Sequence, residues 1–145
     1  MNEVAEKYKA NLVVRAQLDA IEEAMSSMDA TPIESFPLRH HFANGMYGRE
    51  MFMPAGTLIT GRIKKDEHIS IISQGEVYEA TEHGAQHIKA PHTFVSAPGT
   101  KRLVYCLQDT VWTTIHRTDE TDLLKLDNEL IAKTHSDVPS LEVVE

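Results

Sequence analysis

Several features that define common protein classes are absent from this sequence of 145 residues. The single cysteine, Cys106, excludes an internal disulfide framework and fits a reducing compartment. No apolar run approaches the about 20 residues that a membrane-spanning helix needs. The first residues also lack the basic start and apolar core of a secretion signal. We therefore expect a cytoplasmic protein with one domain and no membrane partner.

A basic excess is also absent, since the formal net charge is −8. Residues 1–30 contribute −3, residues 31–117 contribute +1 and residues 118–145 contribute −6. A protein that binds duplex nucleic acid is expected to be strongly basic, so we exclude that partner. Seven of the eight histidines lie in residues 31–117, which leaves room for a local basic pocket there.

The first part of the chain, residues 1–30, is predicted to form an N-terminal helix. Residues 2–28 contain neither glycine nor proline and are rich in helix-forming residues. An apolar stripe recurs at spacings of four and three residues through Val14, Leu18, Ile21, Met25 and Met28. The stripe packs either on its own domain or against a second copy, and we expect a homodimer or larger assembly.

The middle of the chain, residues 31–117, has the pattern of short strands separated by Gly and Pro turns. Residues 29–38 hold Pro32 and Pro37 and are predicted to be a linker. We expect strands at Met46–Met53, Leu58–Ile63, Glu67–Ser73, Val77–Ala80, Gln86–Lys89, Thr93–Ser96, Arg102–Leu107 and Thr110–His116. Short strands at such close spacing predict a mainly β sandwich or barrel.

The last part, residues 118–145, is predicted to form a short C-terminal helix followed by a loose tail. Thr118 is the expected N-cap because its hydroxyl can accept from free amides of the first turn. Leu123, Leu126 and Leu130 supply one apolar face, and Pro139 lies in the tail.

Two strand-and-turn segments resemble the two sequence motifs of the cupin superfamily. The first motif has a glycine, a His-x-His pair, a glutamate and a later glycine. Gly75 matches the last glycine, which places His68 at the glutamate and Lys64 and Arg62 at the two histidines. In the second motif Gly99 matches the glycine and Arg102 stands where the family has histidine.

The resemblance covers about the middle half of the chain and implies a single cupin-like, jelly-roll β-barrel. The segments Met51 to Thr57, Lys65 to His68, Pro98 to Arg102 and Asp109 to His116 also resemble cupin-like proteins of unknown role encoded by tailed bacteriophages. This resemblance implies the cytoplasm of a host cell as the location, with the virion as the alternative.

The residue types at these positions favour an anion over a metal ion. Alternate residues of a strand share a face, so an unbroken strand directs Arg62, Lys64 and His68 into one cavity, and Arg102 joins them from a facing strand. Divalent metals need neutral imidazoles and carboxylates, whereas arginine offers a fork that matches carboxylate or phosphate. An ordinary structural explanation stays open, in which Glu50, Asp66, Glu67 or Glu76 neutralises these bases.

We therefore predict a non-catalytic module that holds a small anionic ligand and no cofactor. The expected ligand-binding residues are Arg62, Lys64, His68, Lys101, Arg102, Tyr105 and His116. Two alternatives remain: a virion or host-interaction protein in which the barrel is a scaffold for a protein partner, and a metal-dependent cupin isomerase or oxygenase. The metal ligands would then come from His68, His116 and His92, while His40 and His41 point to opposite faces of a strand.

Overall fold

The computed structural model describes Ala5, residues 31–32, residues 36–81 and residues 83–132. The apolar stripe of residues 14–28 and the tail after Lys133 lie outside the described residues, so the predicted N-terminal helix and the oligomer stay predictions. Within the described part of the chain, no helix has the length and apolarity to cross a membrane.

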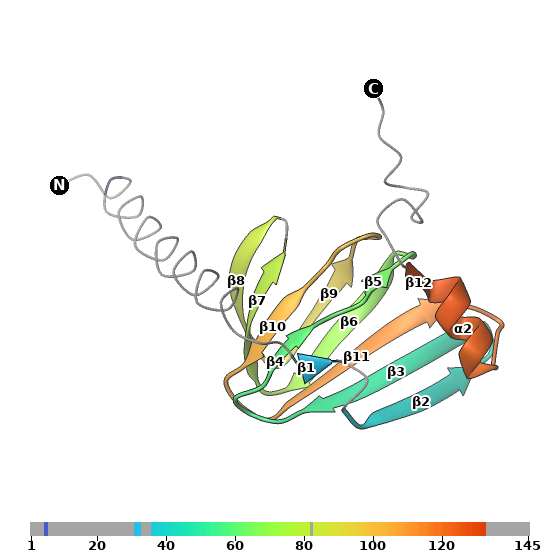
Figure 1. The fold of residues 1–145 in the computed structure, drawn as a ribbon, viewed down its shortest axis with the longest axis horizontal. Coiled ribbons are helices and arrows are strands. Elements are labelled where there is room, and N and C mark those ends of the chain that lie inside the picture. The colour runs from blue at the N-terminus through green and yellow to red at the C-terminus, as the bar shows by residue number, and fades with distance from the viewer. Residues whose placement is uncertain (1–4, 6–30, 33–35, 82, 133–145) are drawn as a thin grey trace.

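The described chain is mainly β, with one short helix near its C-terminal end (Figure 1). Its elements are β1 (Thr31–Pro32), β2 (Leu38–Ala43), β3 (Met46–Met53), β4 (Leu58–Thr60), β5 (Ile63–Lys64), β6 (His68–Gln74), β7 (Glu76–Thr81), β8 (Gly84–Lys89), β9 (His92–Ser96), β10 (Leu103–Cys106), β11 (Thr110–Arg117), α2 (Leu123–Leu130) and β12 (Ile131–Ala132).

Two sheets form the barrel, and strands that are neighbours in either sheet are mostly not consecutive in the chain. One sheet has the order β1-β4-β10-β7-β8 and the other has the order β2-β3-β11-β6-β9. Neighbouring strands are antiparallel apart from the short parallel pair of β1 and β4. A third, small pair joins β12 to β5 and so ties the C-terminal segment to the barrel (Figure 1). This is the jelly-roll arrangement that the sequence predicts for residues 31–117.

The core lies between the two sheets because inward-facing residues alternate with outward-facing ones along each strand. The largest cluster of buried apolar side chains contains Met53, Ile59, Ile72, Val77, Ile88, Val104, Cys106 and Trp112. Cys106 is fully buried, and burial raises the pKa of its thiol to about 11. The thiol is therefore protonated and inert at neutral pH, as its place in an apolar strand predicts.

Several predicted boundaries need correction. The expected strand at Leu58–Ile63 is two strands, β4 and β5, separated at Gly61 and Arg62. Part of the expected linker is strand, since Thr31–Pro32 pairs with β4. β2 continues the sheet next to β3 from Leu38. In this region polar and aromatic residues pair as an exposed edge strand without the apolar alternation that marks buried strands.

The helix cap is also different from the prediction. Asp122 is the N-cap of α2, and its side chain accepts from the amides of Leu124 and Lys125. The Thr118 hydroxyl instead donates to the Glu129 carboxylate at 3.0 Å and accepts from the Glu120 amide. The predicted apolar face is partly correct, because Leu126 and Leu130 are buried but Leu123 is 47% exposed.

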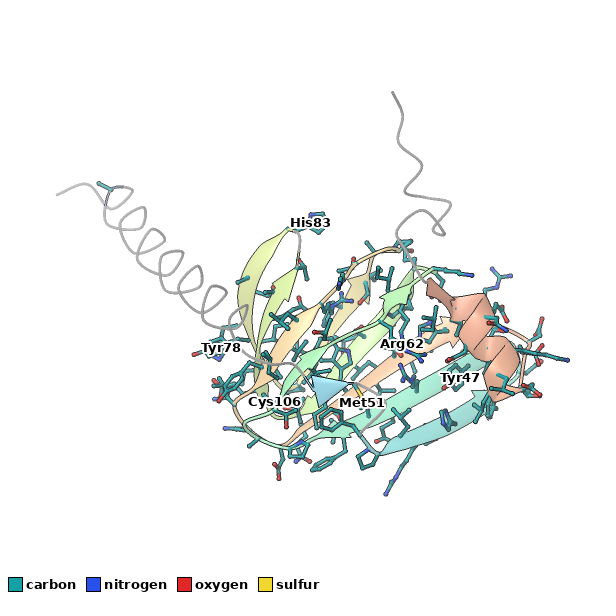
Figure 2. All side chains as sticks on the ribbon, viewed as in Figure 1. Tyr47, Met51, Arg62, Tyr78, His83 and Cys106 are labelled. Atoms are coloured by element: carbon teal, nitrogen blue, oxygen red, sulfur yellow. The ribbon has the colours of Figure 1, made fainter. Side chains whose placement is uncertain are left out.

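Helix α2 closes one end of the barrel. Leu126 and Leu130 pack on Tyr47 of β3, and the Lys65 amide donates to the Leu130 carbonyl at 2.7 Å. Figure 2 shows Tyr47 close to α2, and His83 at the far tip of the hairpin of β7 and β8. The helix therefore holds the segment that carries the predicted cationic residues.

Gly75 joins β6 to β7 in a conformation that only glycine adopts easily. Its φ is +100°, a region in which a Cβ costs about 1–2 kcal/mol. A Cβ placed there would also lie against the Thr110 side chain and 2.6 Å from the Asp109 carbonyl oxygen. Gly56 provides a comparison, because its φ is +83° but a Cβ added to it would meet no atom within 4 Å.

We expect Gly75→Ala to lower the free energy of unfolding by about 3 kcal/mol or more, since strain and overlap act together. Gly56→Ala should lower it by only about 1 kcal/mol, since strain acts alone. Urea unfolding of the two variants beside the parent protein measures the difference. Equal losses would show that the space beside Thr110 relaxes and that the overlap has no cost.

Candidate functional site

The barrel interior contains a cavity of about 70 Å³ whose wall carries several basic side chains. Its polar and charged lining comprises Arg49, Arg62, Lys64, His68, Ser70, Arg102 and Thr114. Its apolar lining comprises Met51, Met53, Ile59, Val104 and Trp112, and the backbone at Gly61 completes it. In Figure 2 Arg62 lies on the side of the barrel nearer α2, and Met51 lies beside β1. No acidic side chain of the described residues lines this cavity.

The structure thus brings together four side chains that the sequence expected to converge: Arg62, Lys64, His68 and Arg102. The expected route was one unbroken strand, but the chain leaves the sheet at Gly61 and again after Lys64. Backbone contacts fix the position of Lys64 instead. Its carbonyl accepts from the Gly99 amide at 2.9 Å, and it pairs with Ile131 of β12. Both the Pro98–Gly99 turn and the C-terminal segment therefore hold Lys64 in the wall.

Lys64 is the most unusual charge of the site. Its side chain is buried, with 8% of the residue exposed. Burial first, and then the charges of Arg49 and Arg62, lower the pKa of its amine to about 7. Asp66 and Asp127 act in the opposite direction, but no carboxylate in the described residues forms an ion pair with it. The amine is therefore divided between its charged and neutral forms at neutral pH.

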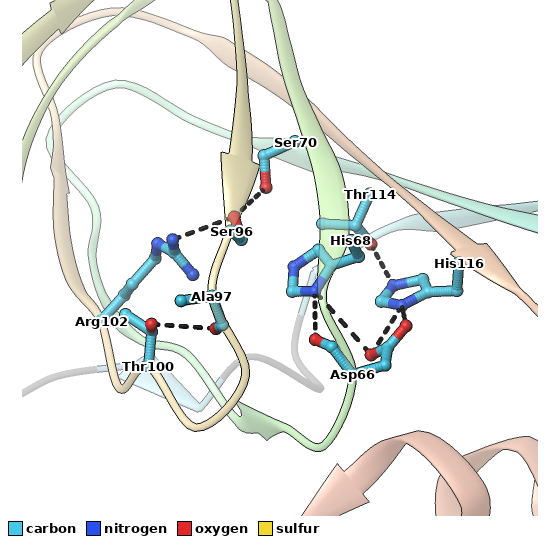
Figure 3. A network of polar contacts seen from close by, with 9 residues as sticks. All are labelled: Asp66, His68, Ser70, Ser96, Ala97, Thr100, Arg102, Thr114 and His116. Atoms are coloured by element: carbon cyan, nitrogen blue, oxygen red, sulfur yellow. Dashed lines mark hydrogen bonds and ion pairs between the residues drawn. The ribbon is translucent and has the colours of Figure 1, made fainter. Parts of the chain in front are cut away.

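Arg102 is bound inside the barrel by a network of polar contacts (Figure 3). Its Nε donates to Glu79 Oε2 at 2.7 Å, and one terminal nitrogen donates to Ser96 Oγ at 3.0 Å. Glu79 is only 2% exposed and also accepts from Gln86 at 2.7 Å. Ser96 shares a hydrogen bond with Ser70. Arg102 and Glu79 thus form a buried ion pair, and hydrogen bonds satisfy both of its charges.

The guanidinium of Arg102 also lies against aromatic rings. It is 5.6 Å from the centre of the Phe94 ring and 5.9 Å from that of Trp112. Such contacts stabilise a desolvated cation.

Arg62 is held differently, since its Nη1 donates to Asp127 Oδ2 of α2 at 2.9 Å. That carboxylate is 56% exposed, so solvent screens this pair.

His68 and His116 lie side by side, and Asp66 contacts both (Figure 3). The His116 Nδ1–H donates to Asp66 Oδ2 at 2.9 Å, and His116 Nε2 accepts from the Thr114 hydroxyl at 2.8 Å. These bonds form a chain from Thr114, which lines the cavity, through buried His116 to Asp66. Asp66 is 27% exposed, so the chain runs from the cavity to the solvent.

The hydrogen bond of His68 determines which of its nitrogens carries the proton. Its Nδ1 is 3.0 Å from the Asp66 backbone carbonyl oxygen, which can only accept. Nδ1 is therefore the donor, and Nε2 carries a lone pair. Burial is the main cause that lowers the pKa of His68 to about 4, with a further contribution from His116. His68 is thus neutral at pH 7 and offers the cavity an acceptor.

Three of the expected site residues lie elsewhere. Lys101 is exposed and lines a separate surface depression beside Asn128. Tyr105 faces outward from β10 and packs with Leu58, because it has the opposite parity to Arg102. His116 is near the site but lines a second cavity, between the barrel and α2, which Arg49 and Lys64 also line. His116 contacts two side chains that line the first cavity, Thr114 and His68.

The alternative metal set of His68, His116 and His92 is not assembled. His92 is exposed and pairs with Ile72, whereas His68 pairs with Ser96 at the other end of β6. Asp66 lies where His92 was expected: the possible ligand atoms of Asp66, His68 and His116 lie within 4.8 Å of one another. His40 and His41 do diverge as expected: His40 Nδ1 contacts the Tyr47 hydroxyl and His41 contacts Glu50.

Sequence reasoning missed two charged residues of the barrel interior. Arg49 lies opposite Thr114 on β11 and lines the cavity, and its parity with Met51 and Met53 was the available signal. Glu79 has the parity of buried Val77 on β7, which could have placed it inside. The neutralising acids considered from the sequence were Glu50, Asp66, Glu67 and Glu76, and none of them pairs with Arg102. Its partner is Glu79.

The metal ion that the cupin resemblance implies does not fit these residues. Three of the four positions that match the family's ligands hold Arg62, Lys64 and Arg102, which repel a cation. The cluster of Asp66, His68 and His116 has suitable donor types. However, the two imidazole rings stack face to face, with centres 4.6 Å apart and an angle of 30°, and both nitrogens of His116 are hydrogen-bonded. We therefore assign no metal ligands.

Comparison with known proteins gives a fold and no closer relationship. No protein-family model and no curated protein matches the sequence. The structure is similar to the cupin domain of Cnp3 from Schizosaccharomyces pombe, with 16% identity, a TM-score of 0.50, and coverage of 72% of this chain and 71% of that one. It is also similar to AerE from Microcystis aeruginosa, with 17% identity, a TM-score of 0.50, and coverage of 62% and 44%.

A cupin domain from Bordetella pertussis matches with 12% identity, a TM-score of 0.47, and coverage of 63% of this chain and 99% of that one. At these identities structural similarity extends to the fold alone. The strand order and the similarity to the Cnp3 cupin domain give the described chain a cupin-like β-barrel fold, as the two sequence motifs predict.

Proposed function

We propose that the cavity of the barrel binds a small anionic ligand. The observation that carries this proposal is the lining: Arg49, Arg62, Lys64 and Arg102 face one small space, and no acidic side chain of the described residues joins them there. Buried cations need a compensating anion. Glu79 compensates Arg102 and Asp127 compensates Arg62, but no carboxylate of the described chain is paired with Lys64. A bound anion would meet this need.

The size and shape of the cavity limit the ligand. About 70 Å³ accommodates roughly five water molecules, so the ligand has only a few heavy atoms. Apolar walls from Met51, Met53 and Trp112 lower the local dielectric and strengthen each charged contact. A small carboxylate or inorganic phosphate suits these dimensions and this charge.

Arg102 is one of the four residues that the sequence predicts around the anion, and it also has partners inside the protein. Its Nε and one terminal nitrogen are engaged by Glu79 and Ser96. Arg102→Ala would leave the Glu79 charge buried without its partner, which typically costs about 3–5 kcal/mol. Loss of binding in that variant could thus follow from misfolding, and Lys64 is the better residue to test.

The bacteriophage relationship and a scaffold role in the virion stay predictions of the sequence. They are compatible with the same cavity but do not explain why a lysine is buried in it.

Replacing Lys64 with methionine should stabilise the protein. Its folded pKa of about 7 lies below the ordinary 10.5, so the unfolded chain holds the proton more tightly between these values. Burial of the Lys64 amine therefore destabilises the folded protein fully below pH 7, and this effect disappears as the pH rises to 10.5. We expect Lys64→Met to add on the order of 2 kcal/mol to the free energy of unfolding at pH 6, with a gain that shrinks toward pH 10.

Thermal unfolding between pH 6 and pH 10 measures this gain. Lys65→Met is the matched control, because the Lys65 amine donates to the Asn128 carbonyl at 2.8 Å outside the cavity. A Lys64→Met protein that is no more stable than its parent at pH 6 would contradict a buried, unpaired charge.

Anion binding should depend on Lys64 and on pH. Calorimetry and thermal shift with phosphate, sulfate and small carboxylates should identify a ligand that Lys64→Met binds about tenfold more weakly or worse, since a charge-assisted contact is worth about 1.5–3 kcal/mol. Binding should weaken as the pH rises above 7, because the neutral amine attracts no anion. Lys65→Met should bind normally, and equal loss in both variants would refute the assignment.

Divalent metals should not stabilise the protein. Zn²⁺, Fe²⁺, Mn²⁺ and Ni²⁺ are expected to leave the melting temperature unchanged, because the basic side chains of the cavity wall repel a cation. Elemental analysis of tag-free protein provides the second measurement. Near-stoichiometric metal that is lost in His68→Ala would favour the metal-dependent alternative.

A further inference from the structure

The amine of Lys64 combines three features that an anion contact alone does not need. It is buried at a cavity wall, two arginines (Arg49 and Arg62) lie close enough to disfavour its charge, and no carboxylate of the described residues pairs with it. A guanidinium in the same place would bind an anion without losing its charge at any physiological pH. What a lysine adds is a neutral amine, which is a nucleophile.

We propose that Lys64 forms a reversible imine with a small 2-oxo acid, an inference that rests on the proposed anion site. The carboxylate of the ligand supplies the negative charge that the arginines of the cavity bind. The carbonyl group, one bond away, then lies within the same small space as the lysine amine. Two functional groups of the ligand thus match two kinds of group in the wall.

The chemistry requires only the protein, the ligand and water. The neutral Lys64 Nζ donates its electron pair to the carbonyl carbon, and the carbonyl oxygen takes up a proton to give a carbinolamine. The nitrogen loses one proton as the carbinolamine forms. The hydroxyl group then takes up a second proton and leaves as water, and the nitrogen electron pair forms the C=N bond of a protonated imine in place of the C=O bond. Hydrolysis reverses each step, so no oxidant or reductant is consumed.

Residues around Lys64 can move these protons. His68 lines the same cavity and has a lone pair on Nε2, because its Nδ1–H is bound to the Asp66 carbonyl. The Thr114 hydroxyl, also in the wall, is connected through His116 to partly exposed Asp66. Protons released in the cavity therefore have a hydrogen-bonded route to solvent.

The groups whose charges act on Lys64 come from several neighbouring elements: Arg49 of β3, Arg62 before β5, Asp66 before β6, His68 of β6 and Asp127 of α2. Burial and the two arginines lower the pKa of the amine by more than the two acids raise it. Imine formation should accordingly rise through about pH 7, whereas exposed lysines react only near about pH 10.

The experiment traps the imine with sodium borohydride in the presence of pyruvate or glyoxylate, followed by intact mass measurement and peptide mapping. We expect one adduct per chain, located on Lys64, at neutral pH. Lactate, which has the carboxylate but no carbonyl group, should compete with pyruvate and form no adduct. Lys65→Met should be labelled like the parent protein.

Two variants separate nucleophilicity from charge. Lys64→Met should lose the adduct and also bind anions weakly. Lys64→Arg keeps the charge without a reactive amine, so it should be stabilised against heat by lactate but should give no adduct. Labelling of Lys64→Arg at the parent level would place the reaction on another lysine and overturn the proposal.

The outcomes also distinguish this inference from the anion site on which it rests. If pyruvate, glyoxylate and lactate stabilise the parent protein against heat but borohydride traps nothing, the imine is refuted and the anion site stands. If none of these acids and no phosphate stabilises the protein, and no adduct forms, both are refuted.

Discussion

The interior of this barrel is organised by the need to place positive charge where water is scarce. Arg102 is accommodated because Glu79, Ser96 and two aromatic rings surround it with hydrogen bonds and favourable electrostatic contacts. Lys64 has no such carboxylate among the described residues, and its lowered pKa records the cost. A charge that reduces stability without local compensation is expected where function requires it.

Helix α2 extends this arrangement to the end of the barrel. It buries Leu126 and Leu130 against Tyr47, supplies Asp127 to Arg62, and is followed by β12, which pairs with the strand that carries Lys64. The C-terminal segment thus belongs to the site even though it lies outside the two cupin-like motifs. Loss of the α2 contacts would expose the cationic wall to water and bring the pKa of Lys64 back toward its ordinary value.

The side chains of this cavity differ in charge from the metal ligands that the cupin motifs describe. The positions that match the cupin motifs, Arg62, Lys64, His68 and Arg102, line one cavity. Three of these four side chains are guanidinium or ammonium groups, which repel a divalent ion and attract an anion. A barrel with the same geometry can therefore serve a different ligand class, as expected when function depends on side chains grafted on a scaffold.

The sequence by itself determined the mainly β fold and most strands, because Gly and Pro turns and strand alternation are local properties. It also named Arg62, Lys64, His68 and Arg102 as neighbours, but the unbroken strand expected to align them is absent, and the contacts of Lys64 with Gly99 and β12 hold it in the wall instead. It did not place Tyr105 outside the cavity, and it did not identify Arg49 as a wall residue or Glu79 as the partner of Arg102. Only the tertiary structure decided these points. Which acid meets which base depends on how strands distant in sequence face each other across the barrel, and so does the depth at which the Lys64 amine is buried.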